Sequence, residues 1–289
     1  MKKVLVTGGA GFIGTNLVKT LVEEKKYNIT SLDCYLTGKK SNHVSGVNYV
    51  KGHTSDIDKI FKNEKFDIIF HFGEYSRISK SFTDIKIISD SILVGTPRVL
   101  EYAKKINAKI IYSASSSKFG NNGNYQNLSP YAWMKAKMVE LLKNYSEWYN
   151  LKYEICYFFN VYGPHQISDG EYATVIAIFK KQFLNNEILT VVKPGTQTRD
   201  FTHVSDIIDG VIKTIDLNTN SEWFFRTGKT YSIIEIANQF GDWKFIEKRK
   251  GERLKAEQFN TDTNRKLDWK AKHKLIDWIN EVKGKQTNW

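Results

Sequence analysis

The chain has 289 residues, and its 43 lysines and arginines against 31 aspartates and glutamates give a formal net charge of +12. This length can bury a large core, as one big domain or two modest ones. No run of residues is long and apolar enough to span a membrane, and a strand-like segment follows Met1 so closely that we expect no signal peptide. Cys34 and Cys156 form neither a disulfide framework nor a metal motif, which predicts a reduced, cytoplasmic protein.

The positive charge is compatible with a nucleic-acid-binding protein. However, the lysines are spread along predicted helices and form no arginine-rich or aromatic-interleaved block. We therefore interpret them as a solvated surface, and we expect no nucleic-acid and no membrane partner. A positive field would also attract an anionic ligand. The six histidines form no cluster, which predicts no metal site.

The N-terminal segment has the pattern of a buried strand, a glycine turn and an amphipathic helix. Residues 4–6 are apolar, and apolar residues recur at helical spacing through 17–22. Between them lie three glycines at intervals of three: Gly8, Gly11 and Gly14. In a dinucleotide-binding turn such glycines allow a tight turn, the approach of a pyrophosphate and close helix packing. The helix N-terminus would then face the phosphates, although glycine turns also close strand–helix units that bind no nucleotide.

Two acidic residues follow predicted strands. Asp33 ends the strand at residues 27–32, where a carboxylate can accept both ribose hydroxyls of NAD and would repel a 2′-phosphate. A simple turn residue is the alternative interpretation of Asp33. Asp56 follows the strand at residues 48–52 and could meet an adenine amino group, or it could cap a helix that begins at Ile57.

Strand and helix patterns alternate through about residue 160, which predicts an α/β fold with a Rossmann-type, doubly wound parallel sheet. Further strands are predicted at residues 66–72 and 109–113, with a helix at 84–106 between them. The last of these strands leads into a serine-rich loop at residues 113–120. Because ligands bind beyond the carboxyl ends of the strands in such sheets, this loop is a candidate site.

Tyr131 and Lys135 stand four residues apart in the next predicted helix and therefore share one helix face. A lysine ammonium beside a phenol favours the phenolate, and this would let tyrosine act as a base near neutral pH. The pair alone is common by chance. Its position after the serine loop and the glycine turn makes a catalytic role the favoured interpretation.

These motifs together resemble the extended short-chain dehydrogenase/reductases, in particular the NAD-dependent epimerase/dehydratase family and its members of the UDP-glucose 4-epimerase type. The resemblance covers nearly the whole chain. Its markers are the glycine turn, Asp33 with residues 36–38, Asp56-Ile57, residues 71–73, residues 113–120, Tyr131 with Lys135, residues 159–164 and residues 198–201.

The resemblance implies a role for each matching position. Ser115 would hydrogen-bond the reacting sugar hydroxyl, with Ser116 and Ser117 able to share this role, while Tyr131 would be the acid/base and Lys135 would hold the nicotinamide ribose. Residues implied to contact the substrate diphosphate are Asn160, Arg199 and Arg249, although a surface salt bridge is the alternative for either arginine. Residues implied to bind NAD are Gly8, Gly11, Phe12, Ile13, Gly14, Asp33, Asp56, Ile57, Phe72, Gly73, Ser113, Tyr131, Lys135, Phe158 and Val161.

Several positions depart from the family pattern. Gly73-Glu74 replaces the usual alanine pair after His71, which puts a carboxylate near the expected cofactor site, and the sequence offers no physical account of it. Other departures are Ile92, Tyr157 and His165. These departures bear on the substrate more than on the fold.

We expect a Rossmann domain at residues 1–163 with a return segment at about 196–226, and a nucleotide-sugar-binding lobe at residues 164–195 and 227–289. Predicted elements of the second half are helices at 172–184, 206–217, 232–240 and 274–282 and a strand at 188–192. A homodimer is also expected, because relatives pair the two helices that carry the following apolar residues: Ile88, Trp133, Met134 and Leu141.

The implied function is C4 epimerisation of a UDP-hexose through a transient 4-keto sugar. A 4-keto-sugar reductase is the alternative, and a 4,6-dehydratase is disfavoured because Ser116-Ser117 stands where dehydratases carry Asp-Glu. A non-enzymatic, NAD-sensing binding protein would be expected to have lost Tyr131 or Lys135, and both are present.

Overall fold

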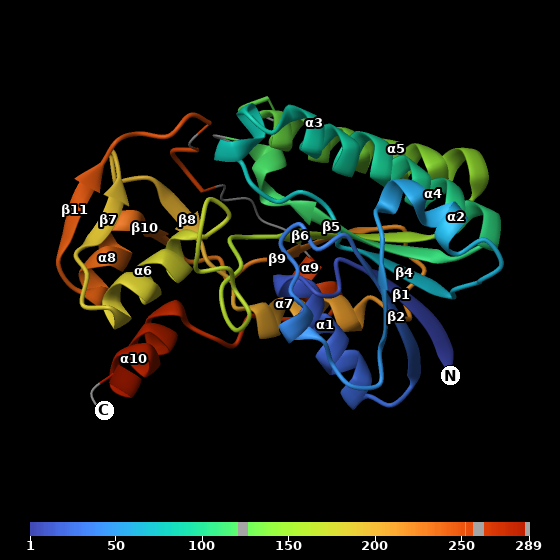
Figure 1. Cartoon of the computed structure of the whole chain (residues 1–289), viewed down its shortest axis with the longest axis horizontal. Helices are drawn as coiled ribbons and strands as arrows, with labels where there is room; N and C mark the ends of the chain where they lie inside the picture. Colours follow the sequence, from blue (N-terminus) through green and yellow to red (C-terminus); the bar gives the residue numbers. More distant parts are fainter. Residues whose placement is uncertain (121–126, 252, 257–262, 287–289) are drawn as a thin grey trace.

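The computed structural model describes residues 1–120, 127–251, 253–256 and 263–286 (Figure 1). Its centre is a seven-stranded, entirely parallel sheet in the order β3-β2-β1-β4-β5-β6-β9. The strands are β1 Lys2–Thr7, β2 Tyr27–Asp33, β3 Asn48–Lys51, β4 Ile68–His71, β5 Lys109–Ser115, β6 Tyr153–Phe158 and β9 Glu222–Phe225. The predicted α/β fold with a doubly wound parallel sheet is confirmed.

Helices cover both faces of this sheet (Figure 1). One face carries α2 Ile57–Ile60, α4 Gly95–Ile106 and α5 Pro130–Tyr149, and the other carries α1 Phe12–Glu23, α7 Val204–Lys213 and α9 Thr263–Lys266. The side chains of β1 alternate between the two layers: Leu5 packs on the α4 and α5 side, while Val4 and Val6 pack on the α1 and α7 side. A strand buried on both faces explains the continuous apolar run in the sequence.

The helix predicted at residues 84–106 is present with an irregular centre. It consists of α3 Ile85–Ile88, a π-helical segment at Ser89–Val94 and then α4. Pro97 lies in the first turn of α4, where a proline is better tolerated than in a helix interior. Short 3-10 helices cover Lys40–Asn42, Thr54–Asp56, Ser79–Phe82 and Ser116–Phe119.

The second half of the chain builds a smaller lobe beside the sheet (Figure 1). Its elements are α6 Val175–Leu184, β7 Leu189–Val192, β8 Thr198–Asp200, β10 Thr230–Ser232, α8 Ile233–Phe240, β11 Trp243–Ile246 and α10 Leu275–Gln286. The lobe has its own core, with Phe179, Ile236 and Phe240 packed against α10. The helix predicted from residue 172 begins later, at Val175. Ser232 and Glu235 form a capping box that starts α8.

A buried lysine ties the returning chain to the main sheet. Lys109 on β5 donates hydrogen bonds to the carbonyl oxygens of Thr214 and Ile215 at 2.7 and 3.0 Å, just after α7. Glu154 on β6 accepts from the indole N–H of Trp223 on β9 at 2.6 Å. These contacts satisfy carbonyl groups left free at the end of α7 and fix β9 at the edge of the sheet.

None of the helices in the described ranges combines the length and the apolar character that crossing a bilayer requires. The cytoplasmic location expected from the sequence stays a prediction.

Candidate active site

A cavity of about 440 Å³ lies between the main sheet and the lobe, at the carboxyl ends of the central strands. Open α/β sheets bind their ligands at this edge. The cavity is lined by these residues that the sequence predicts for the site: Gly8, Gly11, Phe12, Ile13, Gly14, Asp33, Phe72, Gly73, Ser113, Ser115, Ser116, Ser117, Tyr131, Lys135, Phe158, Asn160, Val161, Arg199 and Arg249. The fold therefore brings together candidate cofactor and substrate residues from both halves of the chain.

The glycine turn has no room for larger side chains. Gly8 has a φ of +75°, and a Cβ atom there would lie 2.7 Å from Cα of Gly73. A Cβ atom on Gly14 would lie 2.0 Å from the carbonyl oxygen of Gly8. Only with these glycines can the turn bring the N-terminus of α1 to the cavity. A glycine turn that places a helix N-terminus at a cavity is the arrangement of a pyrophosphate-binding site.

Asp33 ends β2 at the cavity wall, and its carboxylate is held by the backbone. It accepts hydrogen bonds from the N–H groups of Ala10 and Tyr35 at 3.0 and 2.8 Å. Burial raises the pKa of Asp33, although these hydrogen bonds act in the opposite direction. The carboxylate is thus fixed in place beside the glycine turn, where a ribose would lie.

Two predicted cofactor residues lie outside the cavity lining. Asp56 is paired with Lys59 through a contact of 2.9 Å, and its side chain neither caps α2 nor lines the cavity. Ile57 is fully buried in the core on the α4 side of the sheet. The neighbouring His53 and Thr54 line the cavity instead. The cavity wall at this loop is therefore formed by side chains other than the two that the sequence singles out.

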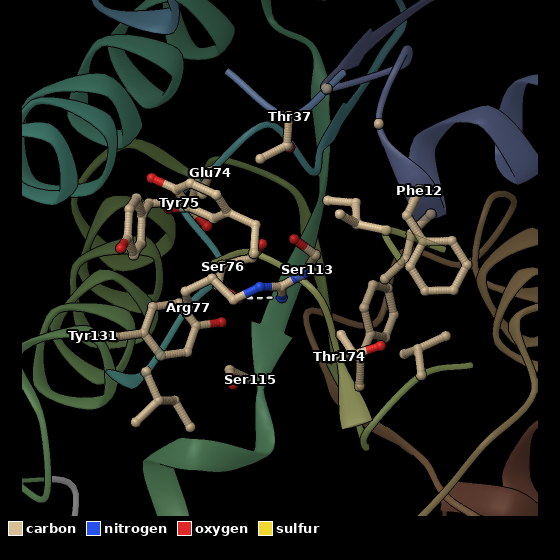
Figure 2. Close-up of a pocket in the computed structure, with 18 of the residues that line it drawn as sticks. Phe12, Thr37, Glu74, Tyr75, Ser76, Arg77, Ser113, Ser115, Tyr131 and Thr174 are labelled. Atoms are coloured by element: carbon tan, nitrogen blue, oxygen red, sulfur yellow. Dashed lines mark hydrogen bonds between the residues drawn. The ribbon is translucent and has the colours of Figure 1, made fainter. Parts of the chain in front are cut away.

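Ser115 and Tyr131 come from neighbouring elements and face the cavity (Figure 2). Ser115 ends β5, and Tyr131 lies in the first turn of α5, which Ser129 caps by accepting from the N–H of Ala132 at 3.1 Å. Burial raises the pKa of Tyr131 to about 12, while hydrogen bonding to Ser115 and the charge of Arg77 act in the opposite direction. A phenol with this pKa is neutral at neutral pH.

Lys135 has partners that the sequence did not predict. Its ammonium group donates to the carbonyl oxygen of Ser113 at 2.6 Å and to the hydroxyl of Tyr112 at 2.9 Å, and it forms an ion pair with Glu74. The side chains of Lys135 and Glu74 are only 4% and 3% exposed. The positive charge expected to favour the Tyr131 phenolate is therefore largely compensated by a carboxylate.

A chain of hydrogen bonds connects the ion pair of Glu74 and Lys135 to Thr96, His71 and Thr7. Thr7 accepts from the backbone N–H groups of residues 72 and 73, so its own hydroxyl donates to Nδ1 of His71, at 2.9 Å. Nε2–H of His71 then donates to Thr96 at 3.0 Å, and the Thr96 hydroxyl donates to Glu74. This order requires a neutral imidazole protonated at Nε2, a tautomer inferred from the network.

The ionisation states of the network agree with its geometry. Burial lowers the pKa of His71 to about 4, so the imidazole is neutral at neutral pH. Burial raises the pKa of Glu74, but the charge of Lys135 and the hydrogen bonds from Lys135 and Thr96 together outweigh burial, and the pKa is lowered. Burial lowers the pKa of Lys135, and Glu74 opposes this shift. Glu74 is thus a carboxylate that stabilises a buried ammonium group.

Sequence reasoning missed two further arginines that line the cavity. Arg77 comes from the loop after β4, and Arg253 donates to the carbonyl oxygen of Ser116 at 2.9 Å. The sequence signal for Arg77 was the presence of two charged residues, Glu74 and Arg77, in a loop at the carboxyl end of a parallel strand. Arg253 is four residues beyond Arg249, in a segment whose course the sequence did not indicate.

Replacing Glu74 with glutamine should destabilise the protein by about 3–5 kcal/mol, because Lys135 would keep a buried charge without its partner. The free energy of unfolding is measured in urea at neutral pH. The lowered pKa of Glu74 adds stability that is complete above its ordinary pKa and is lost as the pH falls. Glu74→Gln should therefore lose part of the acid dependence of stability.

A double-mutant cycle with Lys135→Met provides the internal control, since the double variant should be much less destabilised than the sum of the single ones. Glu140→Gln is the matched surface control, because it removes an exposed pair with Lys137 on α5 and should cost less than about 1 kcal/mol. Strictly additive effects of Glu74→Gln and Lys135→Met would contradict a coupled pair.

Comparison with known proteins places this site in a family. The model of the NAD dependent epimerase/dehydratase family matches residues 4–227. UDP-glucuronic acid decarboxylase 3 of Arabidopsis thaliana is 31% identical in an alignment 252 residues long, which covers 81% of this chain and 72% of that protein. A putative UDP-glucose 4-epimerase of Methanocaldococcus jannaschii is 31% identical in an alignment 246 residues long, which covers 81% of this chain and 79% of that protein.

Among solved structures, the UDP-glucose 4-epimerase of Thermotoga maritima, determined with UDP-glucose, has the same fold, with a TM-score of 0.91 and 24% identity over 99% of each chain. The family match runs from β1 through β9 and includes the glycine turn, the Ser115 loop, Tyr131 and Lys135. The chain therefore belongs to the NAD-dependent epimerase/dehydratase family, whose cofactor is NAD.

Proposed function

We propose that the protein is an NAD-dependent 4-epimerase of a UDP-linked sugar. The observation that carries the proposal is the buried Tyr131 beside Ser115 at the cavity, next to a loop in which Ser116 and Ser117 hold no ionisable group. The family resemblance implies that 4,6-dehydratases carry Asp-Glu at that loop, as an acid and a base in addition to the tyrosine. A site with one proton-transferring residue instead suits oxidation and re-reduction at a single carbon.

Residues of both halves would hold the substrate. Arg199 and Arg249 line the lobe side of the cavity, and forked guanidinium groups suit the oxygens of a diphosphate. Asn160 is fixed by donating to the carbonyl oxygen of Asp200 at 2.9 Å. With the diphosphate at these residues, the sugar would reach Ser115, whose hydroxyl would hold the C4 hydroxyl, and Tyr131, whose phenolate form would accept its proton.

The cofactor residues fit NAD. The glycine cradle at Gly8 and Gly14 suits a pyrophosphate, and the fixed Asp33 carboxylate would accept ribose hydroxyls and repel the additional phosphate of NADP. When bound, NAD accepts a hydride from a sugar carbon and can return it. Since Tyr131 is neutral, its proton transfer depends on the groups that favour its phenolate, namely Ser115 and Arg77.

The reaction is tested by supplying the purified protein and NAD⁺ with UDP-glucose, UDP-N-acetylglucosamine or UDP-glucuronate in heavy water, and examining the sugars by NMR. We expect a C4 epimer of at least one of them without solvent deuterium on carbon. Tyr131→Phe should bind NAD normally yet lose about 10²–10⁴-fold in turnover, because it removes the proton-transferring group.

Other products would contradict the epimerase. Deuterium at C5 with loss of water would indicate a dehydratase, and deuterium at C5 with release of carbon dioxide would indicate a decarboxylase. A protein that reacts only with a keto-sugar and consumes NADH would be a reductase. Binding of NAD with no reaction in either direction, in wild type and Tyr131→Phe alike, would favour a sensing protein.

We also propose that the protein is a homodimer that pairs the faces of α3 and α5. Ile88 and Met134, expected at such an interface, are buried in the monomer core, so they are unavailable to it. Exposed apolar side chains remain on these two helices: Ile85, Ile87, Trp133, Trp148 and Tyr149. Light scattering at micromolar concentration should return twice the mass of one chain, and Trp133→Glu should halve it. A wild-type mass near 33.4 kDa would contradict the dimer.

A further inference from the structure

Arg77 presents an incompletely bonded guanidinium group at the cavity. The residue lies in the loop after β4, and its side chain extends into the cavity past Tyr131 (Figure 2). One terminal nitrogen donates to the carbonyl oxygen of Ser76 at 2.8 Å. Nε is buried and has no hydrogen-bond partner. A buried donor without an acceptor is costly, so its persistence beside a cavity points to a partner that arrives with a ligand.

The charge of Arg77 has no anion either. No carboxylate among the described residues forms an ion pair with it, and the two acids closest along the chain have other partners. Glu74 is paired with Lys135, and Asp84 accepts from the hydroxyl groups of Tyr75 and Tyr172 at 2.9 and 3.1 Å.

The titratable groups that contribute most to the pKa of Arg77 are phenols. They belong to Tyr131, Tyr75 and Tyr172, and burial raises the pKa of each of them, so they are neutral at neutral pH. Burial lowers the pKa of Arg77 to about 10, which is the expected effect of removing a cation from water without supplying an anion. Arg77 is therefore a cation in the cavity lining whose charge no anionic side chain among the described residues compensates.

The position of Arg77 indicates which part of a nucleotide-sugar would meet it. Its side chain lies beside Tyr131 in the cavity, and Tyr131 is the residue at which the sugar would react (Figure 2). The diphosphate has other candidate cations, Arg199 and Arg249. A carboxylate on the sugar ring would approach the planar guanidinium group close to the reacting carbon, and it could accept two parallel hydrogen bonds, including one from the buried Nε.

We propose that Arg77 binds a carboxylate carried by the sugar, so that the substrates are nucleotide-linked acidic hexoses rather than neutral ones. This inference rests on the proposed function and names the substrate class of the same site. Arg77 acts here as a specificity-determining residue, because a neutral sugar would leave the guanidinium group buried without its anion.

The test compares the dissociation constants of UDP-glucuronate, UDP-glucose and UDP by calorimetry, with NAD⁺ present. The wild type should bind UDP-glucuronate about tenfold or more tightly than UDP-glucose. Arg77→Gln should remove this preference and leave the affinities for UDP-glucose and UDP within about threefold. Arg77→Lys should keep part of the preference, since it retains the charge but not the fork. The matched control is Arg98→Gln, an exposed arginine on α4, which should leave all three affinities unchanged.

Three results would overturn the inference while leaving the proposed function intact. In the first, the wild type binds UDP-glucuronate and UDP-glucose with equal affinity. In the second, Arg77→Gln weakens the binding of all three ligands equally, and in the third, Arg77→Gln binds all three ligands as the wild type does but reacts more slowly. The second result would place Arg77 at the diphosphate, and the third would make it a partner of Tyr131 alone. Failure of the wild type to bind even UDP would overturn the proposed UDP-sugar function as well. NAD binding and a thermal melt confirm that each variant is folded.

Discussion

The buried ion pair between Glu74 and Lys135 is the interaction that organises the active site. It joins the loop after β4 to α5, and Thr96 on α4 and Tyr112 on β5 complete its hydrogen bonds. Taking two charges out of water is expensive, and only such a set of additional hydrogen bonds offsets the cost. The pair thereby fixes the face of α5 that looks into the cavity, and Tyr131 lies one turn before Lys135 on that face.

The same loop also changes the distribution of charge around the reacting group. Glu74 compensates the charge of Lys135, and Arg77, three residues further along, adds an uncompensated cation near Tyr131. The familiar serine, tyrosine and lysine are thus retained, while the electrostatic environment of the tyrosine comes from a loop outside the family motifs. Local charge of this kind affects both the ionisation of the phenol and the choice of substrate.

Much of this architecture is predictable from the sequence because it is local. The apolar run of β1, the spacing of Gly8, Gly11 and Gly14, and the alternation of strands and helices each depend on neighbouring residues. The partner of Lys135 is not predictable in this way, since Glu74 lies 61 positions away and meets it only because β4 and β5 are adjacent. Asp56 shows the converse, because its local spacing allows several roles, and the structure pairs it with Lys59.

The central claim is that a nucleotide-sugar lies across the cavity with its reacting carbon at Tyr131. A crystal structure of the Tyr131→Phe variant with NAD⁺ and UDP-glucuronate tests this most directly. The account predicts the diphosphate at Arg199 and Arg249, the C4 hydroxyl within about 3–3.5 Å of Ser115, and the sugar carboxylate on Arg77. A sugar bound with C4 directed away from Ser115 and position 131 would contradict it.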